Sequence, residues 1–278
     1  MSSSSIPLIA LITAGSAGLG ATVAELFARN GMRVVINYAS NAQRAEDLVA
    51  KLKAITTLQP QDGRTDYHAI KADLSSRADV ERLVEEAVQA MCPSQTTTTT
   101  TTTTKKKLDV VFSNGGWTQI RNLFDLEDNM FDDDWDRCFT MNVKSHLWLM
   151  HAAKPYLEAS WDEEARQSGS FITTASLAGV KVSGSSLAYA VTKAAQLHLA
   201  KGLAMLAAPK VRVNSVSPGL LLTEWGLKFP PERIQMMTES SKLRRLATVE
   251  DVAEQVLTFV KNKSVTGQNM VLDGGWGL

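Results

Sequence analysis

Apolar and polar positions follow each other along the chain in blocks. Apolar runs without internal polar alternation recur through the sequence, and such runs are typical of parallel strands buried on both faces. Between them, apolar residues recur every three or four positions, which predicts amphipathic helices. The predicted strands span residues 7–12, 32–37, 67–71, 108–112, 170–174, 211–216 and 267–272. This order predicts one α/β domain over residues 1–278, with a doubly wound parallel sheet and helices on both faces.

Two segments depart from this pattern. Residues 92–107 contain nine consecutive threonines and three lysines. Because such a tract has no apolar side chains to bury, we predict a disordered surface insertion, with a basic binding tail as the alternative. Residues 220–243 combine Trp225, Phe229 and Met236 with two prolines. This segment predicts a mobile apolar lid over a substrate pocket, and a packed irregular connection is the alternative.

The overall composition excludes several classes of partner. Lys+Arg and Asp+Glu both number 29, so the formal net charge is zero and predicts neither nucleic acid nor a membrane as a partner. Cys92 and Cys138 do not have the spacing of a metal or redox motif, which is typical of a reduced intracellular protein. No segment has the pattern of a signal peptide or the length of a membrane span, so we expect a cytoplasmic protein.

An acidic run opens a long predicted helix. Asp132 to Asp134 lie in its expected first turn, and the helix is predicted to extend to about Leu157. We interpret these carboxylates as a helix cap rather than a metal site. Asn142 falls inside this helix, where asparagine is unfavourable unless it has a role. His146 and His151 are five positions apart and do not stack as zinc ligands do, so we predict no bound metal.

A glycine-rich turn follows the first predicted strand. It reads Thr13-Ala14-Gly15-Ser16-Ala17-Gly18-Leu19-Gly20 and leads into a helix. In this setting backbone N–H groups and a helix N-terminus bind phosphate. The glycines are spaced G-x-x-G-x-G rather than G-x-G-x-x-G, so a plain tight turn is the alternative.

The ends of the second and third strands carry candidate nucleotide contacts. The second ends in Asn37-Tyr38-Ala39-Ser40-Asn41, where folds that prefer NAD usually place an acid. No carboxylate stands here, and Ser40, Asn41 and Arg44 could bind a 2′-phosphate, which favours NADP(H) over NAD(H). Arg44 could also be an ordinary surface residue. Asp73 follows the third strand and could contact adenine or cap the next helix.

The stretch from Ser176 to Lys193 holds the candidate proton-transfer groups. Tyr189 and Lys193 are four apart on a predicted helix from 186 to about 208, so they share one face. A neighbouring cation lowers the pKa of a phenol, which is about 10 without it. With Ser176 the pair can donate or accept a proton, whereas an isolated Y-x-x-x-K is usually a solvated pair. The helix is apolar nearly all round, which predicts burial, here against a partner subunit.

Taken together, these motifs resemble the short-chain dehydrogenase/reductase family over nearly the whole chain. Residues 13–20 are similar to its T-G-x-x-x-G-x-G cofactor turn, 113–116 to N-N-A-G, and 218–223 to P-G-x-x-x-T. The resemblance is to the short single-domain branch, which includes 3-oxoacyl-carrier-protein reductase-like and fungal ketone reductases. It implies a Rossmann fold and a catalytic tetrad at Asn142, Ser176, Tyr189 and Lys193.

The resemblance also implies roles for these residues in an NADP(H)-dependent oxidoreductase. Tyr189 would donate a proton to a carbonyl oxygen that Ser176 positions, as hydride arrives from the nicotinamide. Lys193 would lower the Tyr189 pKa and hold the nicotinamide ribose, and Asn142 would hold a water that relays protons. The implied cofactor-binding residues are Gly15, Ser16, Gly18, Leu19, Gly20, Asn37, Tyr38, Ser40, Asp73, Leu74, Asn114, Gly115, Gly116, Tyr189, Lys193, Pro218, Gly219 and Thr223.

Several positions depart from the family pattern. Ala14 replaces the first turn glycine, which carries a cost if that position needs a positive φ. Ser113 and Gly115 alter N-N-A-G, and Ala17 stands where many NADP-preferring members have a basic residue. None of these changes removes a catalytic group.

The sequence also leaves open other enzyme activities and a non-catalytic function. One is an epimerase or dehydratase of the extended branch, whose glycine spacing and longer C-terminal domain the chain lacks. Another is a non-catalytic dinucleotide-binding regulator, although such proteins usually lose the Tyr or the Lys. A third is an NAD-dependent alcohol dehydrogenase of the same family. Trp117, Trp225, Phe229 and Met236 favour a bulky apolar or aromatic ketone as the small-molecule substrate, and the resemblance implies a homodimer or homotetramer.

Overall fold

A parallel sheet forms the centre of the molecule. The computed structural model describes residues 6–93, 95–97, 100–102, 105–165 and 167–278. In this described part of the chain, seven strands pair in parallel in the order β3-β2-β1-β6-β7-β8-β9. The strands are β1 (Ile9–Ile12), β2 (Arg33–Tyr38), β3 (Tyr67–Lys71), β6 (Val110–Ser113), β7 (Gly169–Thr174), β8 (Val211–Pro218) and β9 (Asn269–Leu272). The strand order reverses between β1 and β6, where parallel sheets of this kind bind ligands.

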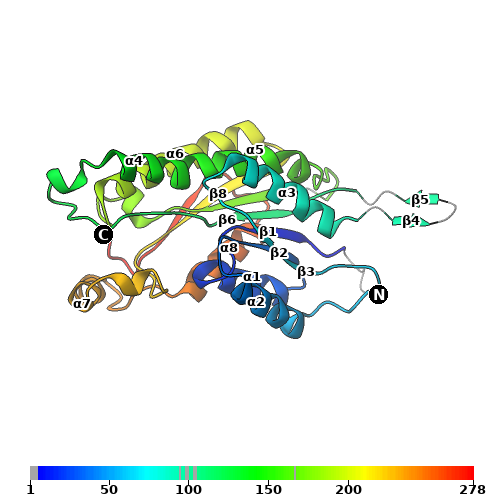
Figure 1. Ribbon diagram of the computed structural model, residues 1–278, viewed down its shortest axis with the longest axis horizontal. Coiled ribbons are helices and arrows are strands. Elements are labelled where there is room, and N and C mark those ends of the chain that lie inside the picture. Colours follow the sequence, from blue (N-terminus) through cyan, green and yellow to red (C-terminus); the bar gives the residue numbers. More distant parts are fainter. Residues whose placement is uncertain (1–5, 94, 98–99, 103–104, 166) are drawn as a thin grey trace.

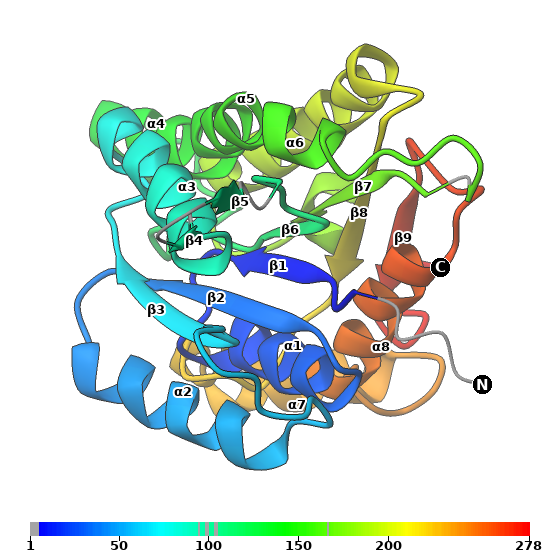
Figure 2. The same ribbon diagram turned by 90° about the vertical axis from the view of Figure 1, so that its right-hand side faces the viewer.

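Helices cover both faces of the sheet (Figures 1 and 2). One layer contains α3 (Arg77–Met91), α4 (Asp132–Phe139), α5 (Ser145–Glu158) and α6 (Leu187–Ala207). The other contains α1 (Gly18–Arg29), α2 (Ala42–Ile55) and α8 (Val249–Lys261). The predicted fold, a doubly wound parallel sheet with helices on both faces, is confirmed.

Strand β1 shows why the sheet needs two helical layers. Its side chains point alternately to opposite faces. Ile9 and Leu11 belong to one hydrophobic core, and Ala10 and Ile12 belong to the other. All four are buried, and a fully buried Leu or Ile contributes roughly 1.5–3 kcal/mol relative to exposure. The unbroken apolar run is therefore the sequence signature of this sandwiched strand.

The predicted helix from Asp132 to Leu157 is not continuous. It is α4 and α5 joined by a π-helical turn, η2 (Thr140–Lys144). Turns of this kind inside helices are frequent at functional sites. Asn142 lies in this turn and is buried, which accounts for an asparagine at a position where a regular helix disfavours it.

Two peripheral segments bear on the predictions. In the insertion, β4 (Gln95–Thr97) and β5 (Thr100–Thr102) pair antiparallel and project away from the sheet (Figure 1). Residues 94, 98–99 and 103–104 lie outside the described residues, and the disorder predicted for 92–107 stays a prediction. The predicted lid contains a short turn, η4 (Gly226–Lys228), and a helix, α7 (Pro231–Ser240).

The long helix α6 is less enclosed than its sequence predicts. Met205 and Leu206, near its end, are 83% and 78% exposed. The burial predicted for this helix is therefore incomplete within one chain, and a covering subunit stays a prediction. Among the described residues, no helix has both the length and the apolar character needed to span a bilayer.

Candidate active site

A cavity of about 760 Å³ opens at the carboxyl ends of the central strands. Its lining includes Ala14 after β1, Asn114 after β6, Thr174 at the end of β7 and Pro218 at the end of β8. The predicted lid closes another side. Of the predicted site residues, the lining includes Gly18, Leu19, Asn114, Gly116, Ser176, Tyr189, Lys193, Pro218, Gly219 and Thr223. The cavity therefore joins the glycine turn to the predicted proton-transfer groups.

Ser176 and Tyr189 lie together in this cavity. Ser176 follows β7, and its Oγ accepts a hydrogen bond from the Ala178 backbone N–H at 3.1 Å. Ser186 caps the start of α6 by accepting from the Tyr189 N–H at 3.2 Å, which fixes where Tyr189 leaves the helix. The Ser176 side chain also acts on the phenol, because it favours a lower pKa of Tyr189. Burial raises the pKa of Tyr189 to about 12 and outweighs the opposing effect of Ser176. Tyr189 therefore carries its proton at neutral pH.

Lys193 is held from two sides one turn further along α6. Its Nζ donates to the Thr174 carbonyl oxygen and to Gln196 Oε1, both at 2.9 Å. Burial lowers the pKa of Lys193 to about 7. The ammonium lies 5.6 Å from the centre of the Tyr189 ring. The predicted lowering of the Tyr189 pKa by Lys193 is not what this structure shows, because burial dominates the titration of the phenol.

Asn142 joins the loop after β6 to α6. Its Oδ1 accepts from the Trp117 N–H at 2.8 Å, and its Nδ2 donates to the Trp117 carbonyl oxygen at 2.9 Å. The same Nδ2 donates to Thr192 Oγ1 at 3.0 Å. The side-chain amide thus clamps Trp117 beside the cavity. Its predicted role in holding a water stays a prediction.

The glycine turn has the form of a phosphate cradle. Ala14 has a φ of 47° and Gly18 a φ of 50°, so both adopt the left-handed region. A Cβ on Gly20 would lie 2.4 Å from the Ala14 carbonyl oxygen, so this position requires glycine. Helix α1 receives no side-chain cap from Ala17. Its first backbone N–H groups are therefore suited to hold the phosphates of a dinucleotide.

Other predicted nucleotide contacts have structural roles. Asn37 is buried, and its Oδ1 accepts from the Ala14 N–H at 3.1 Å while its Nδ2 donates to the Ala72 carbonyl oxygen at 3.0 Å. Asp73 accepts from the Ser75 N–H at 2.9 Å, and Ser76, not Asp73, caps α3. The predicted cofactor-binding residues outside the cavity lining are Gly15, Ser16, Gly20, Asn37, Tyr38, Ser40, Asp73, Leu74 and Gly115, and the predicted catalytic residue outside it is Asn142. A contact between these residues and a cofactor stays a prediction.

The altered N-N-A-G motif has a packing explanation. A Cβ on Gly115 would lie 2.4 Å from Leu74 Cδ1. Leu74 is buried and fills the space that an alanine methyl group would need. The glycine at this position therefore accommodates the leucine after β3.

Arg44 joins the first turn of α2 to the predicted lid. Its Nη1 contacts both carboxylate oxygens of Glu224, at 3.1 and 3.0 Å. The predicted ligand of a 2′-phosphate is thus paired with an acid. The Glu224 side chain is 80% exposed, and a pair of this kind stabilises a protein by only about 0–1 kcal/mol. A stronger anion can therefore displace Glu224 at small cost.

Comparison with known proteins identifies the family. A family model described as enoyl-(acyl carrier protein) reductase matches residues 13–277. The chain belongs to the short-chain dehydrogenase/reductase family. It is 33% identical over 269 residues to a Streptomyces violaceoruber protein described as a ketoacyl reductase of the granaticin polyketide synthase, covering 96% of this chain and 95% of the relative.

Solved structures of this family match the whole fold. The Pseudomonas aeruginosa RhlG/NADP active-site complex gives a TM-score of 0.81 at 26% identity, covering 98% of this chain and 96% of that one. A 7α-hydroxysteroid dehydrogenase complexed with NADH and 7-oxo glycochenodeoxycholic acid gives 0.79 at 26% identity, covering 96% and 93%. This short-chain dehydrogenase/reductase thus has structural neighbours with either cofactor and is an oxidoreductase acting on CH–OH or C=O groups.

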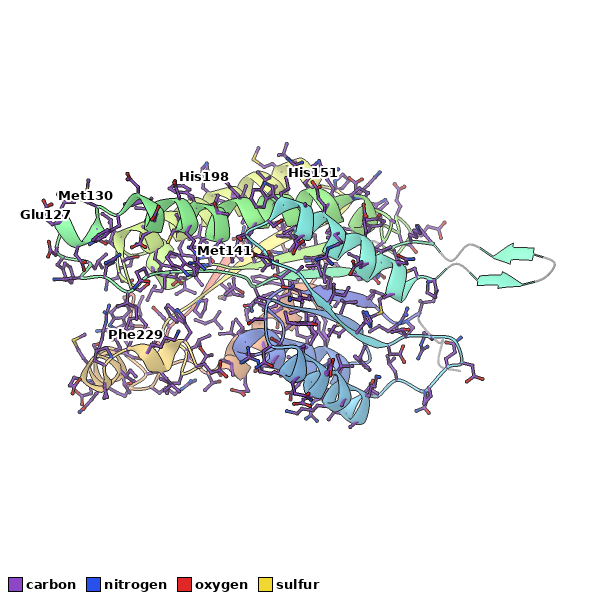
Figure 3. All side chains as sticks on the ribbon, viewed as in Figure 1. Glu127, Met130, Met141, His151, His198 and Phe229 are labelled. Atoms are coloured by element: carbon purple, nitrogen blue, oxygen red, sulfur yellow. The ribbon has the colours of Figure 1, made fainter. Side chains whose placement is uncertain are left out.

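Aromatic side chains line the cavity beside the predicted catalytic groups of this family member. The Trp225 ring lies 6.2 Å from the Tyr189 ring and 5.4 Å from the Phe229 ring, edge to face with the latter. Figure 3 shows Phe229 on the lid segment, beneath the layer that carries His198. Met236 and Met237 from α7 also line the cavity.

Three residues near the site were missed by sequence reasoning. Gln196 lies three positions after Lys193, a spacing that places both on one helical face and could have indicated it. His146 was considered only as a zinc ligand, and its partners come from other elements. Glu224 is 180 positions from Arg44, so no local pattern reveals that pair.

Proposed function

We propose that this protein is an NADP(H)-dependent ketoreductase that acts on a bulky apolar or aromatic ketone, or on the corresponding secondary alcohol. The main observation is that Tyr189 and Ser176 line the same cavity, with the Trp225 ring 6.2 Å from the Tyr189 ring. This arrangement offers a proton donor, a second hydroxyl and an apolar surface to one substrate carbonyl.

Each residue of the predicted tetrad has a different role in the proposed reaction. The nicotinamide, when bound, supplies or accepts the hydride. Tyr189 donates its proton to the carbonyl oxygen during reduction and takes it back during oxidation. Ser176 hydrogen-bonds the same oxygen and holds it in line with the phenol. Lys193, while protonated, stabilises the phenolate left on Tyr189. Asn142 keeps Trp117 against the cavity, which excludes water from that side.

The preference for NADP(H) rests on the end of β2. The segment from Asn37 to Asn41 carries no carboxylate that would repel a 2′-phosphate. Arg44 lies in the first turn of α2, with its guanidinium in an exchangeable pair with Glu224. Ser40, four positions before Arg44, is exposed. A 2′-phosphate that displaces Glu224 would gain a charge-assisted hydrogen bond to Arg44.

The substrate class rests on the size and lining of the cavity. A volume of about 760 Å³ exceeds what a small alcohol or a simple sugar would fill. Trp117, Trp225, Phe229 and Met236 line it, and long unbranched Met side chains adapt to irregular apolar shapes. The similar ketoacyl reductase of a polyketide synthase and the 7-oxo steroid complex are consistent with a large ketone.

The proposed assembly is supported by the exposed apolar surface of α6. Met205, Leu206 and Val191 are exposed on a helix whose sequence is apolar nearly all round. A second copy of the chain would cover this surface, giving a homodimer or homotetramer in the cytoplasm.

The test is turnover with a matched pair of phenol deletions. NADPH and NADH oxidation is followed with aromatic, polyketide-like and 3-oxoacyl ketones, using wild-type protein, Tyr189→Phe and Tyr156→Phe. We expect turnover with NADPH that Tyr189→Phe reduces at least about 10³-fold, as for loss of an essential acid together with its charge effects. Tyr156 packs on the core away from the cavity, so its variant keeps activity. Fluorescence titration confirms that Tyr189→Phe still binds NADPH.

Two results would contradict the proposal. Full turnover by Tyr189→Phe would remove Tyr189 as the acid. NADPH binding without turnover of any ketone, in an otherwise folded wild-type protein, would favour a dinucleotide-binding regulator.

A further inference from the structure

A line of buried polar side chains extends from Lys193 into the protein interior, behind the cavity. Gln196, His146 and Ser113 come from α6, α5 and β6, and each is 1% exposed. Gln196 Oε1 lies 2.9 Å from Lys193 Nζ, and Gln196 Nε2 lies 3.0 Å from His146 Nε2. His146 Nδ1 lies 2.6 Å from Ser113 Oγ. Three elements of the fold thus contribute to one connected hydrogen-bond chain that ends at the catalytic ammonium.

The ammonium determines which Gln196 atom faces it. Lys193 can only donate, so the Gln196 atom that faces it is the carbonyl oxygen. The two hydrogens of the Gln196 amide nitrogen then face three polar atoms, which are Thr173 Oγ1, the Thr174 carbonyl oxygen at 3.1 Å and His146 Nε2 at 3.0 Å. Thr173 Oγ1 also lies 3.2 Å from His146 Nδ1, so Thr173 belongs to the same hydrogen-bond network. Burial and the Lys193 charge lower the pKa of His146 to about 3, so the ring stays neutral.

A series of hydrogen-bonded polar side chains inside a hydrophobic core requires an explanation. Buried polar groups cost free energy unless each is paired, and apolar side chains of similar volume often stabilise a core equally well. The rest of the buried face of α6 is mainly alanine. The described contacts fix two of the three Lys193 ammonium hydrogens, on Thr174 and Gln196. The remaining hydrogen is free to serve a group in the cavity that Lys193 lines.

We propose that Gln196, held in place by His146 and Ser113, is a positioning residue that orients the Lys193 ammonium and keeps it charged during catalysis. This rests on the proposed function, in which the charge of Lys193 stabilises the Tyr189 phenolate. Gln196 itself does not line the cavity, and it contacts the lining through Lys193 and the Thr174 carbonyl oxygen.

The titratable groups facing Lys193 are few and neutral near pH 7. They are Tyr189 on the same helix, Cys138 on α4 and His146 on α5. Burial raises the pKa of Cys138 to about 11. The Gln196 dipole is therefore the nearest described side-chain partner that favours the charged form of Lys193.

The test replaces Gln196 in two opposite ways. Gln196→Met keeps the length of the side chain and removes the acceptor, which disfavours the ammonium. Gln196→Glu places an anion against the ammonium, which favours it. In carbonyl reduction we expect the alkaline limb of the kcat–pH profile to move down by about one pH unit in Gln196→Met and up by a similar amount in Gln196→Glu. A purely structural role would lower activity in both variants without shifts of opposite sign.

A matched control lies on the outer face of α5. His151 is exposed and, as Figure 3 shows, is on the outer side of the helical layer. We expect His151→Asn to keep the wild-type profile. If Gln196→Met does not fold, His146→Leu tests the same chain, because it frees Gln196 to rotate and moves the limb in the same downward direction by a smaller amount.

A measurement that does not depend on turnover tests the positioning role of Gln196 separately from the proposed reductase activity. The pH titration of the Lys193 side chain by NMR, with ¹³C at Cε and Lys193→Arg for assignment, needs no substrate. Opposite displacement of the Lys193 midpoint in Gln196→Met and Gln196→Glu supports the inference even if every ketone fails. Unchanged midpoints in both folded variants overturn it, whether or not the wild-type protein is an active reductase.

Discussion

The substitution Ala14→Gly measures how much backbone strain the glycine turn of this protein contains. The Ala14 φ of 47° lies in the left-handed region, which costs an L-residue roughly 1–2 kcal/mol. Ala14→Gly relieves this cost. Two effects oppose the gain: glycine loses roughly 0.4–1 kcal/mol more conformational entropy on folding, and a half-buried methyl group contributes less than about 0.8 kcal/mol. The balance is a stabilisation of about 0.5 kcal/mol.

The same substitution at an unstrained position provides the reference. Ala50 is exposed inside α2, where glycine costs about 1 kcal/mol relative to alanine. We therefore expect Ala14→Gly to be more stable than Ala50→Gly by about 1.5 kcal/mol in urea unfolding. In thermal melts this corresponds to a difference of about 3–6 °C, at roughly 2–4 °C per kcal/mol for a chain of this size.

The comparison between the two variants decides the question. Equal losses of stability in Ala14→Gly and Ala50→Gly would refute the strain argument, because both would then report only the entropy of glycine. NADPH affinity gives a second measurement. Ala14 lines the cavity, so the loss of its methyl group is expected to leave the dissociation constant unchanged or lower it, and weaker binding would show that the methyl group contacts the cofactor.

Two further predictions concern charges at the site. Glu224→Gln frees Arg44 from its ion pair, so the KM for NADPH should fall by about 1.5- to 5-fold, which is the free energy of an exposed ion pair expressed as a ratio. The KM for NADH should not change. An equal effect on both cofactors would show that Arg44 does not bind the 2′-phosphate. Burial lowers the pKa of Lys193 from 10.5 to about 7. Between these two pH values the unfolded chain binds a proton at Lys193 that the folded chain has lost. The free energy of unfolding therefore rises with pH, by at most about 1.4 kcal/mol per pH unit from this group. Urea unfolding at pH 7.5 and 9 should show this rise in the wild type and a smaller one in Lys193→Met, and identical pH slopes would mean that the buried amine is not strongly perturbed.

The features that sequence predicted best are those with a local cause. Strand β1 could be predicted from the sequence because a strand covered on both faces is apolar at every position. The start of α8 also has a local cause, because Thr248 and Asp251 form a capping box in which each side chain bonds to the other residue's backbone N–H. Tyr189 and Lys193 share a helical face by spacing alone. Each prediction needed no knowledge of a distant partner.

The features that sequence missed depend on partners far along the chain. The π-helical turn from Thr140 to Lys144 contains no helix-breaking residue, and its form goes with the bonds of Asn142 to Trp117 and Thr192. Glu224 has no local signal either, since Arg44 approaches it only after the sheet has formed. Such positions are decided by tertiary contacts, which a single sequence does not display.

The departures from the family motifs show how neighbouring contacts accommodate an unusual residue. Gly115 replaces a larger residue because Leu74 occupies the space of its side chain. Ala14 replaces glycine at a left-handed position, yet its backbone is fixed on both sides: its N–H donates to Asn37 Oδ1 at 3.1 Å, and its carbonyl oxygen accepts from Asn114 Nδ2 at 3.4 Å. These two asparagines hold the turn in place despite the cost of the alanine. The cradle geometry is thus set by side chains on β2 and after β6, and the motif glycine itself is dispensable for the shape of the turn.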